Sequence, residues 1–439
     1  MTDPAPIVLK FGGAALSDPA RVVRWIRLRG GPGNPLLVVV SAREGVTDRL
    51  LQSARPPVRS TRIPRLLGEL RRRHPVPDPV IDPILQTVDA TLRGIAASRS
   101  REPSELDRLA AQGERLAAVW LAHEMNLRGL AATSLDADRL GLRTDRNFGA
   151  ARIRLEASRA TVRRRIDRVW AADRIPVVTG FFGQGPGRTI TTLGRGGSDY
   201  SATALGAMLG ARRVELLKQR VSIRSADPRW VPRSRPLGYL SYEEAEELAQ
   251  FGARVLHAWA IEPARQARIP ILVRSLADPR QTTTVGPAID HGTPRALTVL
   301  PSLRLLGLRV PGGREQPGIM AEVTRCLAAA QVNVIQLYTS ATMLCAIVES
   351  REAGTARRAL ARLVQHREMT VEPPQEVEMV IAIGERILED LYRVPRSILR
   401  TTLGVAATPR ALSLAVRTAD LGPTLRALHR ALVEIPPRP

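Results

Sequence analysis

Two lysines stand out in a chain whose other basic side chains, histidines aside, are all arginines. The 439 residues include 65 Lys and Arg, and only Lys10 and Lys218 among them are lysines. A compact ammonium on a flexible stem differs chemically from a planar guanidinium, so the retained lysines indicate places where chemistry needs an ammonium. Each lysine follows an apolar run, and Lys10 precedes the glycine turn Gly12-Gly13, which is typical of a phosphate site. The alternative is that both lysines are chance survivors of a general drift toward arginine.

A second candidate anion site is the glycine-rich segment 191–199, which leads into a predicted helix. Glycines let backbone amides approach an anion closely, and the N-terminus of the following helix adds its dipole. Arg195 can bind a carboxylate through two parallel hydrogen bonds. Ser198 and Asp199 could instead simply cap the helix. Another glycine-rich turn lies in 177–185, so two such loops at one sheet edge predict a ligand crevice there.

The elements that must position these residues alternate between strands and helices as far as about residue 285. This alternation predicts an α/β domain with a mainly parallel sheet. The predicted strands are 36–40, 131–135, 176–179, 214–217 and 269–273, and the predicted helices are 21–27, 106–128, 153–172, 200–209 and 242–267.

Three further regions have their own character. Residues 52–83 are rich in proline and arginine and predict a helical insertion or a surface excursion. Residues 282–294 are interpreted as a linker. Beyond them, two strand–helix–strand patterns, near 296–370 and 377–436, each have the size of a small α+β module.

The formal net charge of +23 raises the question of nucleic-acid binding. The arginines, however, are spread along the whole chain, without the interleaved aromatic residues that stack on bases. No zinc-finger or helix-turn-helix signature is present. We therefore predict a solvated arginine-rich surface with only weak, salt-sensitive binding to polyanions, and no specific nucleic-acid partner.

Composition also bears on the compartment. The two cysteines, Cys326 and Cys345, indicate neither a disulfide framework nor a metal site, which fits a reducing cytoplasm. No apolar run approaches the roughly 20 residues of a membrane span, and the first residues do not resemble a signal peptide. The sequence thus predicts a cytoplasmic protein with no membrane partner.

Several motifs, in their order and spacing, resemble aspartate kinase, a family with an amino-acid-kinase domain followed by paired ACT domains. The motifs are 10–13 (KFGG), 40–42 (VSA) with 46–48 (VTD), 113–116 (GERL), the two glycine-rich loops above, 225–229 (SADPR), 241–244 (SYEE) and 251–257 (FGARVLH). The resemblance covers most of 7–285. It implies a three-layer α/β sandwich with a mainly parallel sheet, followed by two small α+β ACT-like units. The corresponding domains are 1–287 and 296–439.

The resemblance implies transfer of the γ-phosphoryl group of ATP, with Mg²⁺, to the side-chain carboxylate of L-aspartate. This is the first step toward lysine, threonine and methionine. Such a transfer depends on positioning and charge neutralisation. The implied catalytic residues are Lys10, which would hold the transferring group, and Ser41. Glu114 would bind the substrate ammonium and Arg195 its α-carboxylate. The other implied substrate-binding residues are Thr47, Phe181 and Ser198.

The implied nucleotide site departs from the family pattern. Its residues would be Lys10, Gly12, Gly13, Lys218, Arg229 and Arg254, with Arg254 standing where the family usually has lysine and no side chain assigned to a metal. Gln219 and Val221 occupy positions where the family has aspartates. The first of these aspartates organises the active-site lysine and nearby cations, and losing one partner of a desolvated charge cluster typically costs several kcal/mol.

Two alternatives to an aspartate kinase therefore stay open. The chain could be a catalytically impaired paralogue that regulates another process or binds an amino acid. It could also phosphorylate a different carboxylate, because Ala14-Ala15 replaces a Thr-Ser pair of the family. The ACT-like region is atypical around 337–342, so the feedback effector is left open. We expect this region to assemble a homo-oligomer, because open sheet edges favour pairing.

Overall fold

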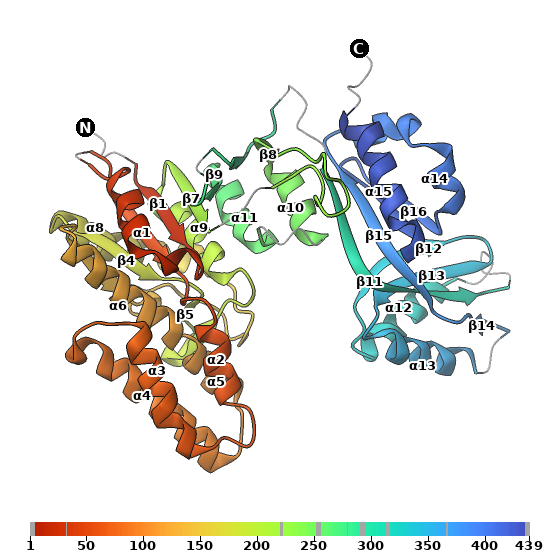
Figure 1. The fold of residues 1–439 in the computed structure, drawn as a ribbon. Coiled ribbons are helices and arrows are strands. Elements are labelled where there is room, and N and C mark those ends of the chain that lie inside the picture. Colours follow the sequence, from red (N-terminus) through yellow and green to blue (C-terminus); the bar gives the residue numbers. More distant parts are fainter. Residues whose placement is uncertain are drawn as a thin grey trace. The chain divides into compact units, whose positions relative to one another are not determined.

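The computed structural model describes most of the chain as two compact units (Figure 1). The described residues are 5–31, 33–219, 223–251, 256–278, 280–289, 296–311, 317–365 and 368–434. The first unit comprises the described residues within 1–223, 237–246 and 254–289, and the second comprises those within 224–236, 247–253 and 290–439.

An eight-stranded sheet, in the order β3-β4-β2-β1-β7-β9-β10-β8, forms the middle of the first unit. Only the β9–β10 pair is antiparallel among its described pairings, so the mainly parallel sheet is confirmed. Central strands buried on both faces form continuous apolar runs, as in β1 and β2. The strands are β1 (Ile7–Phe11), β2 (Leu36–Val40), β3 (Ala132–Leu135), β4 (Ile175–Thr179), β7 (Arg213–Lys218), β8 (Tyr239–Ser241), β9 (Ile271–Ser275) and β10 (Thr282–Gly286).

Helices cover both faces of this sheet and complete the three layers. α1 (Pro19–Arg27) and α6 (Gln112–Leu127) pack against one face, where Phe11 joins a core with Trp25 and Trp120. α8 (Leu155–Ala171), α9 (Gly197–Leu209) and α11 (Ala258–Gln266) lie on the other face. α9 is buried on all sides, as expected of a helix without a polar face. Burying one large apolar side chain stabilises the fold by about 1.5–3 kcal/mol. The many buried residues of these layers therefore hold the sheet rigidly, and with it the strand ends that carry the motifs.

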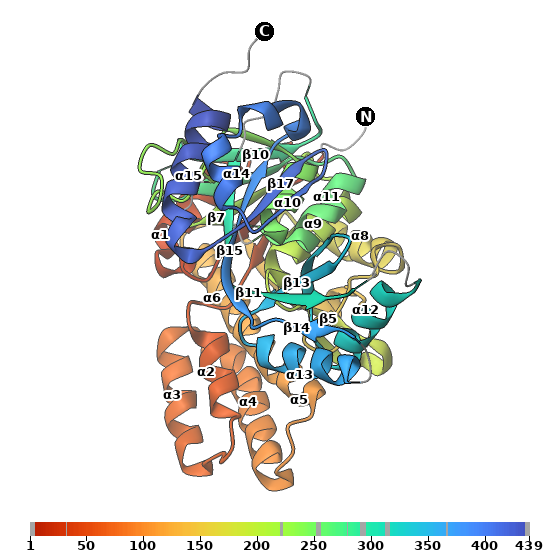
Figure 2. The ribbon, with the colours of Figure 1, turned by 90° about the vertical axis from the view of Figure 1, so that its right-hand side faces the viewer.

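The predicted insertion is helical and longer than expected. It contains α2 (Val46–Ser53), α3 (Ile63–Arg73), α4 (Asp78–Ser98) and α5 (Pro103–Ala110), which Figure 2 shows as one bundle. Apolar side chains of these helices form their own buried cluster, which includes Leu50, Leu70, Leu85 and Leu92.

Three predicted boundaries were wrong. The helix expected at 106–128 is two helices, α5 and α6, separated at Ala111. The helix expected at 242–267 is α10 (Tyr242–Gln250) and α11, with 252–255 outside the described residues. The expected linker begins as strand β10, whose β-branched threonines favour a strand and which pairs with β9.

The second unit contains a seven-stranded sheet with two α+β halves that share one strand. β11 (Ala296–Arg309) pairs with β15 (Gln375–Ile383) along its first part and with β13 (Met343–Glu349) along its last part. The path is β12-β13-β11-β15-β17-β16, with β14 also on β11. The two predicted α+β units are thus present. The remaining elements are β12 (Val334–Thr339), β14 (Thr370–Val371), β16 (Gly404–Ala407), β17 (Ala411–Val416), α12 (Ile319–Ala329), α13 (Ala353–Val364), α14 (Arg396–Thr401) and α15 (Leu421–His429).

The segment 224–236 belongs to this second unit. Ser225 accepts a backbone hydrogen bond from Leu297 at 2.7 Å. Ala226 and Val231 are buried in the core beneath α15. Cys326 and Cys345 are free thiols. No helix in the described part of the chain is long and apolar enough to cross a membrane.

Candidate active site

A cavity of about 310 Å³ lies where β1, β2 and β4 end. The carboxyl ends of parallel strands meet at one sheet edge, which brings residues distant in sequence around one space. The structure gathers all the residues that were predicted for catalysis and substrate binding. These are Lys10, Ser41, Thr47, Glu114, Phe181, Arg195 and Ser198, and the rest of the lining is Ala42, Gly194, Gly196, Gly197 and Asp199.

Asp199 holds both lysines of the chain. Lys10 Nζ lies 2.6 Å from Asp199 Oδ1, and Lys218 Nζ lies 3.2 Å from Oδ2. β1 and β7 are neighbours in the sheet, with Lys10 paired to Leu216, so both ammonium groups reach the first turn of α9. Burial alone would raise the pKa of Asp199, but the two ammonium groups outweigh it and lower the pKa to about 2. The result is a fixed anion between two cations.

Sequence reasoning missed this role, because Asp199 was considered only as a helix cap. α9 instead begins after Gly196, whose φ is +75°, and no side chain caps it. A Cβ on Gly196 would lie 2.5 Å from the His257 Cβ, so the glycine is required by both conformation and space. The sequence did contain a clue to this role of Asp199. Two lysines at the ends of buried strands need a nearby anion, and Asp199 is a carboxylate in the adjacent glycine-rich segment.

Glu114 lies in the first turn of α6 and is 3% exposed. Its Oε1 accepts a hydrogen bond from the Ala42 amide at 2.9 Å, whereas its Oε2 is buried and has no hydrogen-bond partner among the described residues. Burial raises the pKa of Glu114 to about 8, and the Ala42 amide and Lys10 only partly oppose this shift. A Cβ on Gly113 would lie 2.8 Å from the Ala42 Cβ, so this glycine lets α6 approach the turn after β2.

Arg195 and Phe181 come from the two glycine-rich loops. The Arg195 side chain is exposed, and it makes no ion pair with any described residue. Phe181 has a φ of +72°, and its amide donates a hydrogen bond to Ser201 Oγ at 3.0 Å. Residues held at positive φ cost energy and cluster at functional sites. The exposed guanidinium of Arg195 suits the α-carboxylate of an amino acid, and the buried Oε2 of Glu114 suits its ammonium group.

The residues predicted for the nucleotide are only partly gathered. Gly12 donates a backbone hydrogen bond to Leu217 at 3.2 Å, and a Cβ on Gly13 would lie 2.5 Å from the Ala42 carbonyl oxygen. The turn after Lys10 therefore packs closely between β2 and β7. Gln219 follows Lys218, and its buried Oε1 has no hydrogen-bond partner within the described residues.

One of the two remaining nucleotide residues, Arg229, does not line the cavity. Arg229 belongs to the second unit, is 84% exposed and pairs with Asp227 at 2.6 Å. Arg254 lies outside the described residues. No cluster of three or more side chains suited to a metal occurs in the part of the chain that the structure describes. Both oxygens of Asp199 face ammonium groups, so this carboxylate does not fit as a ligand for Mg²⁺.

Comparison with known proteins defines the class. The amino acid kinase family matches residues 5–275. Lysine-sensitive aspartokinase 3 of Escherichia coli K12 is 29% identical over 401 residues, which cover 88% of each chain. The aspartokinase of Thermus thermophilus is 30% identical over 332 residues, covering 74% of this chain and 70% of that one. The chain belongs to the amino acid kinase family, in its aspartokinase branch.

Solved structures agree with this placement. The structure of E. coli aspartokinase III with lysine and aspartate (T-state) has a TM-score of 0.77 at 26% identity, and 97% of this chain and 99% of that chain are covered. The same protein with aspartate and ADP (R-state) gives a TM-score of 0.77 at 25% identity. The three-layer domain with two ACT-like units is therefore confirmed as the aspartokinase fold.

Proposed function

We infer that this protein is an aspartate kinase, which transfers the γ-phosphoryl group of ATP to the side-chain carboxylate of L-aspartate. The observation that carries this function is one cavity lined by Lys10, Asp199 and Glu114. Asp199 in it pairs with the ammonium groups of both lysines, and Glu114 Oε2 has no hydrogen-bond partner among the described residues. The product would feed amino-acid biosynthesis toward lysine, threonine and methionine. The E. coli relative solved with aspartate and ADP supports this reading over the two alternatives.

In the proposed reaction, the chain orients an amino acid by its two charged groups. Glu114 Oε2 would accept the substrate ammonium, and Arg195 would bind its α-carboxylate through two parallel hydrogen bonds. Thr47, Phe181 and Ser198 would complete the walls. The side-chain carboxylate would then point toward Lys10, where an oxygen lone pair attacks the γ-phosphorus and the bond to ADP breaks.

The nucleophile needs no base, because an aspartate carboxylate is ionised at neutral pH. The work of the protein is therefore to neutralise and position the phosphoryl group. Lys10 supplies a positive charge that Asp199 holds in place, with Ser41 beside it on the cavity wall. Lys218 supplies a second charge from β7. Gly12 and Gly13 would let backbone approach the phosphates.

Magnesium would enter with the nucleotide. When bound, it would neutralise phosphate charge, held by the phosphate oxygens, since Asp199 is committed to the two lysines. We further propose that Arg229 and Arg254 face the nucleotide phosphates.

We also propose that the protein is a cytoplasmic homo-oligomer assembled through the ACT-like region. Light scattering of the full chain would test the oligomeric state.

An ADP-release assay tests the function. L-aspartate should support ADP release, and L-glutamate should support little. Lys10→Ala should reduce the rate by about a hundredfold to a thousandfold, the range typical of lost electrostatic stabilisation. Lys10→Arg is the matched control that keeps charge but changes its shape. No ADP release with any carboxylic acid, together with calorimetric binding of aspartate, would overturn the proposal in favour of an impaired paralogue.

A further inference from the structure

A second cavity of about 630 Å³ lies in the first unit and shares no lining residue with the catalytic cavity. It is open to solvent on one side and is lined by α4, the first turns of α6, the end of β3 with α7 (Ala137–Leu140), and α8. Glu114 lines the catalytic cavity, whereas Gln112 and Arg115 of the same helix line this one. Cavities of this size commonly hold small ligands.

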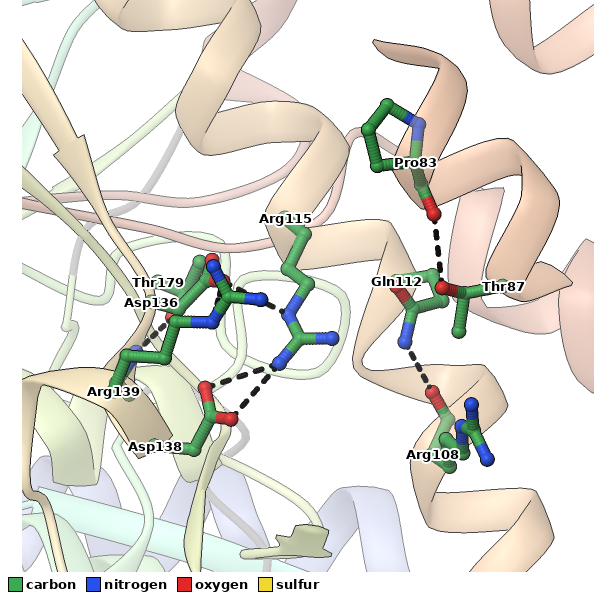
Figure 3. A network of polar contacts seen from close by, with 10 residues as sticks. Pro83, Thr87, Arg108, Gln112, Arg115, Asp136, Asp138, Arg139 and Thr179 are labelled. Carbon is green, nitrogen blue, oxygen red and sulfur yellow. Dashed lines mark hydrogen bonds and ion pairs between the residues drawn. The ribbon is translucent and has the colours of Figure 1, made fainter. Parts of the chain in front are cut away.

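Gln112 gives the cavity an unused acceptor. The residue is completely buried, and its Nε2 donates a hydrogen bond to the Arg108 carbonyl at 2.6 Å (Figure 3). Its Oε1 is buried without a hydrogen-bond partner among the described residues. Leaving such an acceptor unpaired costs about 1–3 kcal/mol. The nearby Thr87 hydroxyl does not relieve this cost, because it donates to the Pro83 carbonyl at 2.9 Å.

The charged lining has a positive excess. Arg115 lies between Asp136, at 3.3 Å, and Asp138, at 3.0 Å, so this guanidinium is neutralised (Figure 3). Arg139 also approaches Asp136, at 3.6 Å, but is 81% exposed. Arg168 lines the cavity and makes no ion pair with any described residue. The exposed arginines favour an anion, and the same excess disfavours an ammonium group.

Apart from Ser134 and Arg165, the rest of the lining is apolar. Ile84 and Leu140 are buried, whereas Val80, a large hydrophobic residue, is 43% exposed. A ligand that covers such a surface gains about 25 cal/mol per Å² of apolar area removed from water. The other apolar residues of the lining are Pro83, Val119, Leu135 and Val169.

We propose that this cavity is a second ligand site, for a small amphipathic carboxylate without an ammonium group. A branched apolar body would pack against Ile84 and Leu140. A neutral hydroxyl would donate to Gln112 Oε1. The carboxylate would pair with Arg168, because hydrogen bonds between charged groups are stronger than those between neutral groups. A branched-chain hydroxy acid has this combination of groups.

Calorimetry on the full chain with three probes tests each part of the match. α-Hydroxyisocaproate has the apolar body, the hydroxyl and the carboxylate. Isocaproate lacks the hydroxyl, and α-hydroxyisocaproamide lacks the charge. We expect α-hydroxyisocaproate to bind tightest, and each of the other two about tenfold more weakly, since one hydrogen bond or ion pair contributes about that factor.

Variants locate the binding. Arg168→Ala should weaken both acids about tenfold and leave the amide unchanged, whereas Arg164→Ala, an exposed arginine of the same helix outside the cavity, should change nothing. Val169→Trp should fill the cavity and abolish binding of all three. If this variant fails to fold, Arg168→Ala alone decides. Absence of millimolar binding by every probe, or binding that Arg168→Ala does not alter, would overturn the proposal.

Discussion

Asp199 and Glu114 line one cavity and are almost equally buried, yet their pKa values are shifted in opposite directions. Asp199 is 6% exposed and Glu114 is 3% exposed, so desolvation acts on both. Two ammonium groups lower the pKa of Asp199 to about 2, whereas burial raises the pKa of Glu114 to about 8 because the Ala42 amide, its own amide and Lys10 oppose it only in part. Neighbours rather than burial decide the charge. One carboxyl pairs with cations that belong to the chain, and we propose that the other binds a cation that a ligand brings.

Removing the first of these carboxylates should have the largest effect. Asp199→Asn leaves Lys10 and Lys218 close together without their anion, and breaking such a buried pair costs about 3–5 kcal/mol. We expect ADP release to fall by about a thousandfold and stability to fall measurably. Circular dichroism would separate the two effects. Asp167→Asn, which breaks an exposed pair with Arg163, is the control. Activity within tenfold of wild type would refute the central role of Asp199.

Neutralising the second carboxyl should act on substrate binding. In Glu114→Gln the substrate ammonium meets an amide rather than a carboxylate, and a charged hydrogen bond contributes about 1.5–3 kcal/mol. The KM for aspartate should rise by about a hundredfold at most, with a smaller change in kcat. Steady-state kinetics measure both. A large fall in kcat at unchanged KM would instead assign Glu114 to the chemical step.

The pKa of Glu114 predicts a pH dependence of aspartate binding. Below about pH 8 the free protein holds a proton on this carboxyl, and only the ionised form attracts an ammonium. Affinity should therefore rise about tenfold per pH unit up to this value and then level off. Calorimetry in two buffers of different ionisation enthalpy should show release of close to one proton near pH 7. In Glu114→Gln, both the slope and the proton release should disappear.

The smallest effect concerns the second ammonium. Lys218→Thr removes one of two charges on Asp199, and since Lys10 remains in place we expect a fall in ADP release of about fivefold. Gln219→Asp and the double change complete the comparison. If Lys218 compensates for the carboxylate absent at Gln219, the double change should not exceed wild type. A double variant more active than wild type would show that Lys218 impairs the site.

Sequence motifs predicted most of the residues that line the candidate catalytic cavity, but not which of these residues contact one another. Lys10, Glu114 and Arg195 were found because local motifs carry them. The contact of Lys218 with Asp199 was missed because it depends on β7 lying beside β1, a neighbourhood that no local pattern encodes. The second cavity could not be anticipated either, because five elements from four separate parts of the chain each contribute a few residues to it.

The predicted boundaries of helices and strands were wrong where local sequence preference and tertiary packing disagreed. The helical pattern at 106–128 continues through Ala111, but the structure divides it so that Asp107 accepts hydrogen bonds from Thr192. The residues after 282 look like a linker by composition, yet the open edge of β9 turns them into a strand. Arg229 belongs to the family motif 225–229, yet this segment packs into the second unit.

The meeting of both lysines at Asp199 makes the active site chemically addressable. Reagents that acylate or reductively alkylate side-chain amines have two targets in this chain, and both lie on one carboxylate. Lys218, with 23% of its side chain exposed, is the more accessible of the two, and Lys10, with 7%, the less. A fluorophore or crosslinker that reacts with side-chain amines would thus be installed beside Asp199 without any engineered residue. The α-amino group of the chain, whose pKa is ordinarily about 8, is the competing target.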